Sequence, residues 1–445
     1  MPPSAFAKLK IAANKRVKNK DFLILLVILL TRLFRGCKDS NFWLHGLGNR
    51  QKGIGNRQKI RNWVSWKLYI FAAKMKMTEI QTKYPDAKAS QTIGLLRWVL
   101  MALIVVIHTN LVADTGCTDT AYGNLYRWAG NVVWLASPLF FLISGYLFVA
   151  SESGFSWQTF IVKCRRRWKT WVIPYLIWNT LFLLFYGLVG LVLPSVLGDV
   201  PPLQEMTLSD VLKAYWCIRG EGFNTGPIDG PLWFLRDLMV IALFTPLYVA
   251  ILKWHKVTLL IPILLGFLPH QLGFESEIAF FMIGIWLNFW MPSLSELLRK
   301  PVWHSLPYYL VGSVLVTVPG LVPEWSIAAL TFVRNLSGML VVASLCHCVT
   351  AQHPERDWRA LAEPVFFVFA FHSLVARPLT KLSASWLLSN DAGSLAFLAT
   401  HFVNAVVTIV ITVLIYYLLR RTMPTVCGWL SGTPPSPKTN NHLTF

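Results

Sequence analysis

The feature that most constrains the fold of this chain is a series of apolar segments, each long enough to cross a membrane. Residues 94–113 and 395–419 are two of them, and a helix of ~20 apolar residues spans ~30 Å of hydrocarbon. Only 14% of the 445 residues are charged, against roughly 25% in a soluble domain. The segments therefore predict membrane-spanning helices and exclude an ordinary soluble domain.

Hydropathy divides the chain after residue 90 into ten such segments, which predicts an all-α, polytopic membrane protein with about ten transmembrane helices. The expected cores are 94–113, 130–149, 170–193, 231–252, 257–272, 275–290, 305–322, 326–350, 361–376 and 395–419. The two segments between 257 and 290 are short. A re-entrant pair there is an alternative that leaves the orientation of the other spans unchanged.

Positive charge is distributed unevenly between the loops, and this predicts the orientation. If the first span begins in the cytoplasm, the loops on that side and the tail as far as Arg421 carry thirteen Lys and Arg, whereas the opposite loops carry five. The five are Arg127, Lys213, Arg219, Arg377 and Lys381. Because positive charge is retained on the cytoplasmic side, both termini are expected there.

Most of the net charge of +20 lies in a leader, residues 1–90. It holds 19 Lys and Arg against 4 Asp and Glu, a net of +15, and the string Gly-Asn-Arg-Gln-Lys occurs twice, at 48–52 and 55–59. Two interpretations are open. Translation starts in vivo near Met75 or Met77, so that the leader is not made, or the leader lies as a basic segment on anionic lipid.

The rest of the chain is expected to divide into a membrane domain over 91–422 and a cytoplasmic tail over 423–445. A nucleic-acid module presents a basic face to water, whereas this domain is apolar throughout. No nucleic-acid partner is therefore expected, and membrane lipid is.

The seven cysteines do not form a disulfide framework. Cys117 and Cys217 are expected outside the cytoplasm, where an oxidising compartment permits a bridge, and two free thiols are the alternative. Cys346-His347-Cys348 resembles a metal site only in sequence, because neighbours one and two apart on a helix do not face each other. We therefore expect buried thiols there and no metal.

Seven ionisable side chains inside the expected spans are singled out as functional candidates, because a charge there costs at least a few kcal/mol. They are Arg97, His108, Arg236, Asp237, Arg334, His372 and His401. Arg97 and His108 are eleven residues apart, so on a helix their directions differ by about 20° and their positions by ~16 Å. One face thus carries a cation near the cytoplasmic end and an imidazole in the outer third. The alternative is structural: a snorkelling arginine and a histidine bonded across helices.

The strings around these residues resemble those of the acyltransferase-3 family in their order and spacing. RWVLMALIVVIH at 97–108 is similar to the family's first-helix motif, a basic residue and a histidine with ten residues between them. Four strings follow it: LFFLISGYL at 139–147, CRRRWKTWVIPY at 164–175, PLWFLRDL at 231–238 and FFVFAFHSLV at 366–375. The resemblance covers about 90–422. It implies a ten-span enzyme of the bacterial inner membrane that transfers an acyl group, usually acetyl from acetyl-CoA, to hydroxyls of surface polysaccharides or their lipid-linked precursors.

Carried over residue by residue, the resemblance places the family's essential histidine at His108 and its helix-one basic residue at Arg97. It maps the basic cluster before the third span to Arg166 and Arg167, while Lys169 stands near a position where relatives often carry another arginine. Acyl-CoA is a cytoplasmic polyanion, so these cations are expected to bind its phosphates. Positive-inside anchoring is the alternative. No bound cofactor is expected, because acyl-CoA is the donor substrate.

His108 is expected to act as general base and to take the proton from a sugar hydroxyl as the hydroxyl attacks the thioester. A covalent acyl-histidine is the minor variant. The further candidates for the site are His372, Arg334, Trp233 and Ser144. His372 is expected to orient the acceptor or His108, and Arg334 has no evident partner in the sequence.

Other members of these strings are expected to be structural. Ser144 and Gly145 are small and would let the second span approach the first closely, which favours packing over chemistry. Arg236 and Asp237 are adjacent and are expected to neutralise each other.

The main alternative function is a transporter or flippase for a lipid-linked sugar or anion, with the same buried charges as its pathway. Such a protein would not release CoA from acyl-CoA, which separates the two hypotheses. A purely structural scaffold is a third, and it leaves the shared face of Arg97 and His108 unexplained. The loop 194–230 is expected to influence acceptor choice, but no residue in it identifies a sugar.

Overall fold

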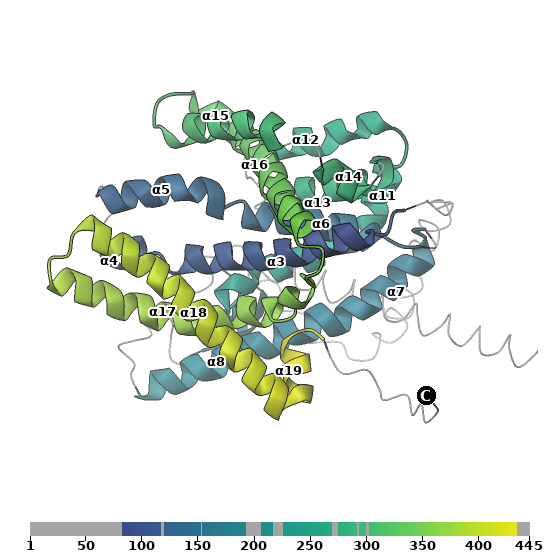
Figure 1. Ribbon diagram of the computed structural model, residues 1–445. Coiled ribbons are helices and arrows are strands. Elements are labelled where there is room, and N and C mark those ends of the chain that lie inside the picture. The colour runs from purple at the N-terminus through teal and green to yellow at the C-terminus, as the bar shows by residue number, and fades with distance from the viewer. Residues whose placement is uncertain are drawn as a thin grey trace, which may run out of the picture.

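The computed structural model describes residues 82–116, 120–152, 154–192, 206–216, 226–268, 275–291, 293–299 and 302–433. Every regular element in these ranges is a helix (Figure 1), so the all-α expectation is confirmed for them. The leader before residue 82, the expected Cys117–Cys217 bridge and most of the segment 194–230 lie outside the described residues. So does the end of the expected tail.

Within the described ranges, six helical segments are long and apolar enough to cross a membrane, judged by length and composition. Four of them are single helices: α3 (Ala87–His108), α16 (Glu324–Gln352), α17 (Val365–Ser389) and α18 (Ser394–Thr422). The segment Ala121–Val149 consists of α5 (Ala121–Val133) and α6 (Ala136–Val149). The segment Trp157–Leu191 consists of α7 (Trp157–Arg167), η1 (Trp168–Val172) and most of α8 (Ile173–Val192). These segments make the chain a multi-pass membrane protein.

The span expected over 231–252 is broken into two helices. Its first half, Gly230–Leu243, consists of η5 (Gly230–Leu232) and α10 (Trp233–Leu243), and its second half is α11 (Thr245–Leu252). The halves meet at 58°. The break falls at Pro246, which has no N–H to bond the preceding turn and whose ring clashes with it.

The count of about ten spans is not confirmed, because three expected segments form short helices in the described part of the chain. They are α12 (Leu260–Gly266), α13 (Glu275–Trp290) and α15 (Leu306–Thr317). At 1.5 Å per residue even the 16 residues of α13 reach only ~24 Å, less than the ~30 Å of hydrocarbon. The six long helices and the broken pair therefore give at most seven spans by this criterion.

A close helix crossing joins α6 to α13 and depends on two glycines. A Cβ on Gly145 would lie 2.0 Å from the carbonyl oxygen of Phe281, and a Cβ on Gly284 would lie 2.0 Å from that of Leu142. The expected packing role of Gly145, beside half-buried Ser144, is therefore confirmed. The expected partner was wrong: this face meets α13 and not the first span, because small residues in one helix do not show which helix lies opposite.

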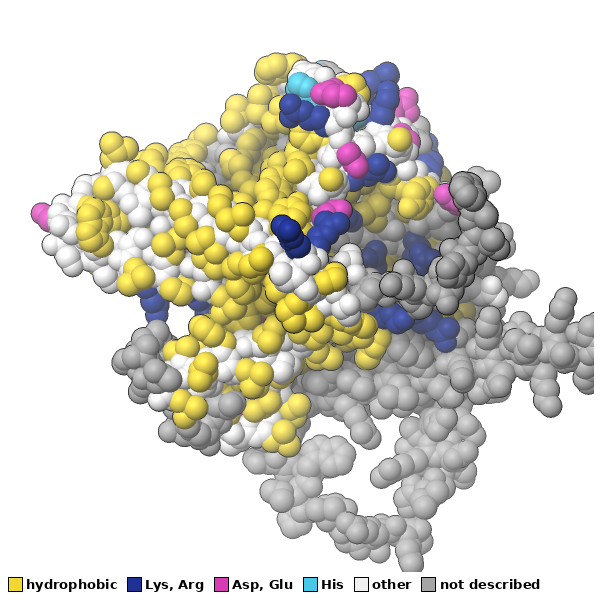
Figure 2. Space-filling model, turned by 60° about the horizontal axis from the view of Figure 1, so that its bottom comes forward, with side chains coloured by type: hydrophobic (Ala, Val, Ile, Leu, Met, Phe, Trp, Pro, Cys, Tyr) yellow, Lys and Arg dark blue, Asp and Glu magenta, His cyan; other side chains and the backbone are white. Residues whose placement is uncertain are grey.

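Helix α3 runs through the middle of the bundle (Figure 1) and contacts α6, α16, α17 and α18. It begins at the N-cap Asp86, whose carboxylate accepts the backbone N–H of Ala89 at 2.7 Å. Around it, apolar side chains cover much of the molecular face in Figure 2, and most of the Lys and Arg visible there gather in its right-hand part. This distribution suits a bundle surrounded by lipid with charge near one end.

The first residues of the expected tail form a helix that packs on the bundle. This helix, α19 (Pro424–Leu430), lies against α8. The indole N–H of Trp178 donates to the carbonyl oxygen of Leu430 at 2.9 Å. The described tail residues therefore belong structurally to the membrane domain.

Candidate active site

The two first-helix candidates lie at different levels of α3, and both side chains are exposed. Arg97 lies in the first half of the helix and His108 is its last residue. Because α3 is continuous between them, their separation of eleven residues corresponds to ~16 Å along one face. One rigid element thus links two polar regions of the protein.

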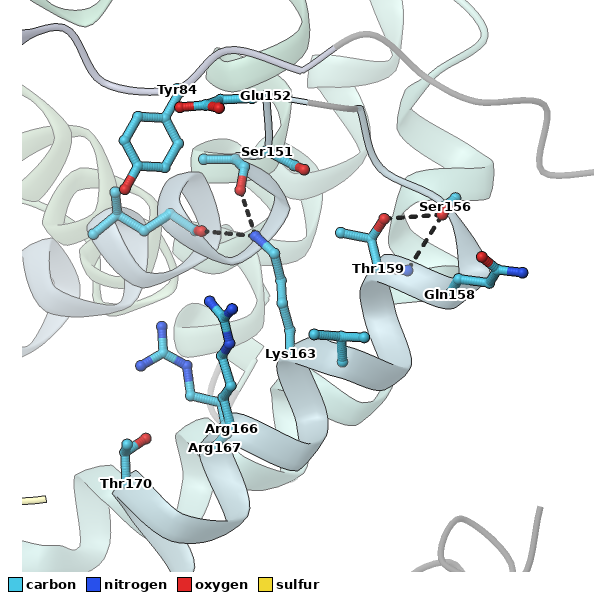
Figure 3. A pocket seen from close by; sticks show the side chains of 13 residues that line it. Tyr84, Ser151, Glu152, Ser156, Gln158, Thr159, Lys163, Arg166, Arg167 and Thr170 are labelled. Carbon is cyan, nitrogen blue, oxygen red and sulfur yellow. Dashed lines mark hydrogen bonds between the residues drawn. The ribbon is translucent and has the colours of Figure 1, made fainter. Parts of the chain in front are cut away.

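A cavity of about 890 Å³ lies near the Arg97 end, between the end of α6 and α7. We call it the basic pocket, and Figure 3 shows the side chains of Lys163, Arg166 and Arg167 at its wall. The others lining it are Tyr84, Leu147, Ala150, Ser151, Glu152, Ser156, Gln158, Thr159, Val162 and Thr170. Its volume is that of a small-molecule site.

The three cations of the basic pocket differ in what they already bind. The ammonium of Lys163 donates to the carbonyl oxygens of Leu147 and Ala150 and so closes the end of α6. The guanidinium of Arg167 lies over the Trp171 ring, 4.4 Å from its centroid, and is close enough to Arg97 for their charges to repel. Arg166 is exposed. No described carboxylate pairs with Arg166 or Arg167, so both remain available to an anion.

Lys169 stands apart from this group. It lies on the exposed side of η1 and does not line the basic pocket. The five-residue η1 is a π-helical turn between α7 and α8, a local widening that recurs at functional sites. It directly follows Arg167 and supplies Thr170 to the pocket wall.

At the other end of α3, polar side chains close the helix immediately around His108. The hydroxyl of Thr109 donates to the Val105 carbonyl at 3.1 Å, and the amide of Asn110 donates to that of Ile107 at 2.6 Å. The Val106 carbonyl accepts from the ring of His401 at 2.8 Å. These bonds satisfy carbonyls that a helix end leaves open.

His401 continues this network into the loop that follows α3. Since its Nε2 donates to a carbonyl, its Nδ1 accepts the hydroxyl proton of Tyr122 at 3.1 Å. The Tyr122 oxygen accepts the backbone N–H of Leu111 at 2.9 Å. His401 is therefore the structural, interhelical histidine of the alternative interpretation, and its bonds hold the end of α3 in place.

His108 lies beside His372 of α17, with their ring centroids 5.1 Å apart. His372 is completely buried, and its Nδ1 lies 2.8 Å from the carbonyl oxygen of Phe369. That contact requires a proton on Nδ1, which leaves Nε2 as an acceptor, and Nε2 has no partner among the described residues. No hydrogen bond to the His108 ring is present there either. The structure thus brings two predicted residues, 264 positions apart, into contact.

Two charged residues near this pair, Arg377 and Asp229, were not among the predicted site residues. Arg377, counted as a loop residue, and Lys381 both lie within α17, which is a correction to the loop count. Asp229 immediately precedes η5, which packs on α17. Two features of the sequence could have pointed to these residues. Asp229 stands two residues before the string PLWFLRDL, and Arg377 follows His372 by five residues.

The remaining candidates lie elsewhere. Arg334 is buried and donates to the amide oxygens of Asn131 at 2.9 Å and Asn335 at 2.8 Å, an arrangement that ties α16 to α5. Trp233 is half-buried at the start of α10. In the same helix Arg236 and Asp237 form the expected ion pair at 2.7 Å.

The residues of the apparent metal motif point in different directions. Cys346 is buried whereas Cys348 is exposed, so only one of the two thiols is enclosed as expected. His347 bonds to Thr92 of α3 at 3.1 Å. This triplet therefore joins α16 to α3.

The structure is therefore a membrane-embedded helical bundle with two polar regions. The basic pocket lies near Arg97, and the pair of His108 and His372 lies at the other end of α3. A family model described as an acyltransferase domain matches residues 91–421. The chain therefore belongs to the acyltransferase-3 family and is an acyltransferase. It is 27% identical over 372 residues to the succinoglycan biosynthesis protein ExoH of Rhizobium meliloti (strain 1021), a match that covers 78% of this chain and 93% of that protein. No solved structure matches significantly.

Proposed function

We propose that the protein transfers an acyl group, with acetyl the expected one, from cytoplasmic acyl-CoA to a hydroxyl of an envelope polysaccharide or its lipid-linked precursor. The similarity to a protein of succinoglycan biosynthesis supports a polysaccharide acceptor. The observation that carries the proposal is that α3 joins the basic region around Arg97 to an exposed His108, whose ring has no hydrogen bond to a described residue.

The donor binds with its phosphates in the basic pocket. Arg166 and Arg167 line that pocket without a described carboxylate partner, and Arg97 adds a third guanidinium nearby. Guanidinium groups bind phosphate in a bidentate manner that an ammonium cannot match. Lys169, on the exposed side of η1, contributes to the field outside the pocket. From the pocket the thioester extends along α3 toward His108.

His108 acts as the general base. It takes the proton of the acceptor hydroxyl as the oxygen attacks the thioester carbonyl carbon, and collapse of the tetrahedral intermediate releases CoA as a thiol that recovers the proton. The imidazole gains positive charge in this step, and the helix dipole at the end of α3, whose last residue is His108, attracts that charge. Direct transfer needs no acyl-histidine.

The same proposal includes the membrane arrangement. The short helices α12, α13 and α15 complete a bundle of about ten helices, and both termini face the cytoplasm of a bacterial inner membrane. Lys163, Arg166 and Arg167 then lie on the cytoplasmic side, where positive charge is retained and where acyl-CoA is available.

Measuring both products tests this function. Membranes that contain the protein should release CoA from [14C]acetyl-CoA and transfer the label to glycan extracted from cells that lack the gene. Membranes without the protein are the control. Transport of a lipid-linked sugar without CoA release would instead support the flippase hypothesis.

A further inference from the structure

Asp229 is fully buried, and its carboxylate forms no hydrogen bond in the described structure. It occupies the position before η5, where an aspartate commonly caps a helix, yet its side chain forms no capping bond. Both carboxylate oxygens lack a hydrogen-bond partner in the described structure. An unpaired buried carboxylate is costly, so Asp229 requires an explanation outside the packing of the protein.

The backbone around Asp229 is held firmly although its side chain is not. The N–H of Asp229 donates to the amide oxygen of Asn179 at 3.3 Å, and the Asn179 amide donates to the Tyr175 carbonyl at 2.8 Å. Asn179 is itself fully buried. The bond to Asn179 of α8 therefore fixes the backbone that carries the Asp229 carboxylate.

A cation faces this carboxylate without pairing with it. A Cβ on Gly230 would lie 3.4 Å from Nη2 of Arg377, and Nη1 of Arg377 donates to the Tyr186 hydroxyl at 2.6 Å. Burial raises the pKa of Asp229 well above its usual range, and the Arg377 guanidinium opposes that rise. Arg377 thus favours the ionised carboxylate while leaving both of its oxygens free.

The free atoms in this region are mostly hydrogen-bond acceptors. They are both oxygens of Asp229 and Nε2 of His372, together with the hydroxyl of Ser373, which can donate or accept. His372 is five residues, or ~7.5 Å of helix, from Arg377. A ligand that satisfies them must supply several donors, as a sugar with free hydroxyls does. His372 also touches the ring of His108, so the bound sugar would lie next to the proposed base.

We propose that Asp229 and His372 form the acceptor subsite and bind hydroxyls of the sugar adjacent to the one that is acylated. This inference rests on the proposed acyl transfer. It defines the acceptor as a polyol with at least two neighbouring free hydroxyls. It also separates the binding of the acceptor, through Asp229, from that of the donor, through the basic pocket.

Titration of each substrate tests the subsite. Membranes with equal amounts of wild-type protein, Asp229→Asn or Asp229→Glu are assayed with [14C]acetyl-CoA and with increasing amounts of glycan extracted from cells that lack the gene. Asp229→Asn should lower kcat/KM for the glycan by about 10- to 100-fold, the range for a hydrogen bond to a charged group. Asp229→Glu should recover part of this, and the KM for acetyl-CoA should stay within about twofold of wild type.

Asp391→Asn is the matched control, since Asp391 is an exposed acid between α17 and α18 whose carboxylate has no hydrogen bond or ion pair in the described part of the chain. It should behave as wild type. An unchanged glycan requirement in Asp229→Asn, or an equal loss for both substrates, overturns the subsite while the proposed function stands. If the wild-type protein transfers no label to the glycan, the proposed function fails and the subsite with it.

Discussion

The imidazole rings of His108 and His372 lie 5.1 Å apart and are inclined to each other by 52°. One ring is accessible and the other is completely enclosed. Because Nδ1 of His372 is engaged by the Phe369 carbonyl, its Nε2 can accept but not donate while the ring is neutral. His108 can therefore exchange a proton with a substrate, and His372 can orient that substrate by accepting a hydrogen bond.

Replacing His108 tests the general base. His108→Gln should lower acyl transfer by about 10²- to 10⁴-fold, because glutamine is polar but cannot cycle a proton near neutral pH. Protein abundance should not change, since no described residue depends on a bond to this ring. The rate of label transfer to glycan is the measurement, and His304→Gln, at an exposed position, is the control. A near-normal rate would refute the assignment.

Replacing the arginines that line the basic pocket tests donor binding. Replacing Arg166 and Arg167 together by Gln should raise the KM for acyl-CoA by about tenfold or more and leave the acceptor requirement nearly unchanged. Added salt should weaken donor binding in the wild type, because it screens charges beyond ~8–10 Å. Arg165→Gln is the control, since Arg165 precedes them but does not line the pocket. Loss of protein from the membrane would point to insertion instead.

The bonds at the end of α3 predict a positioning effect. Tyr122→Phe removes the hydroxyl that accepts the Leu111 N–H and donates to His401. A buried polar group left without its partner costs about 1–3 kcal/mol, so thermal stability and kcat should both fall. Tyr126→Phe is the matched control, because Tyr126 lies against the His401 ring without a described hydrogen bond. Equal behaviour of the two variants would exclude this role.

The glycine crossing predicts a folding defect unrelated to chemistry. Gly145→Ala should sharply reduce the amount of folded protein, because its Cβ would overlap the Phe281 carbonyl and backbone cannot yield as a side chain can. A Cβ on Gly393 meets nothing within 4 Å, so Gly393→Ala should cost only the small preference for glycine over alanine at the N-cap of α18. Fluorescence-detected size exclusion of both variants measures the difference. A monodisperse, abundant Gly145→Ala protein would contradict the close approach of α6 to α13.

Reporter fusions test the orientation. A reporter that is active only outside the cytoplasm should be active after Asn390, between α17 and α18, and silent after Gln352, at the end of α16. This result follows from the excess of Lys and Arg in the loops assigned to the cytoplasm. The opposite pattern would reverse the bundle.

The sequence could predict features that depend on local periodicity. Arg97 and His108 share a helix, so their common face followed from residue spacing alone, and the family strings located His372. Asp229 and Arg377 could not be paired in this way, because 147 intervening positions separate them and only tertiary packing brings η5 onto α17. Hydropathy likewise could not count the spans, since it registers apolar residues but not the break at Pro246 or the short reach of α15.

The π-helical turn η1 has a consequence for how this protein tolerates changes in length. A π turn accommodates one residue more than an α turn, and each α-helical residue rotates the chain by ~100°. Deleting any one residue between Trp168 and Val172 would restore a regular α-helix and swing Arg166 and Arg167 away from their cavity relative to α8. Substitutions in this stretch keep the rotation of α7 relative to α8. Deletion of one residue changes that rotation and would turn Arg166 and Arg167 away from the basic pocket.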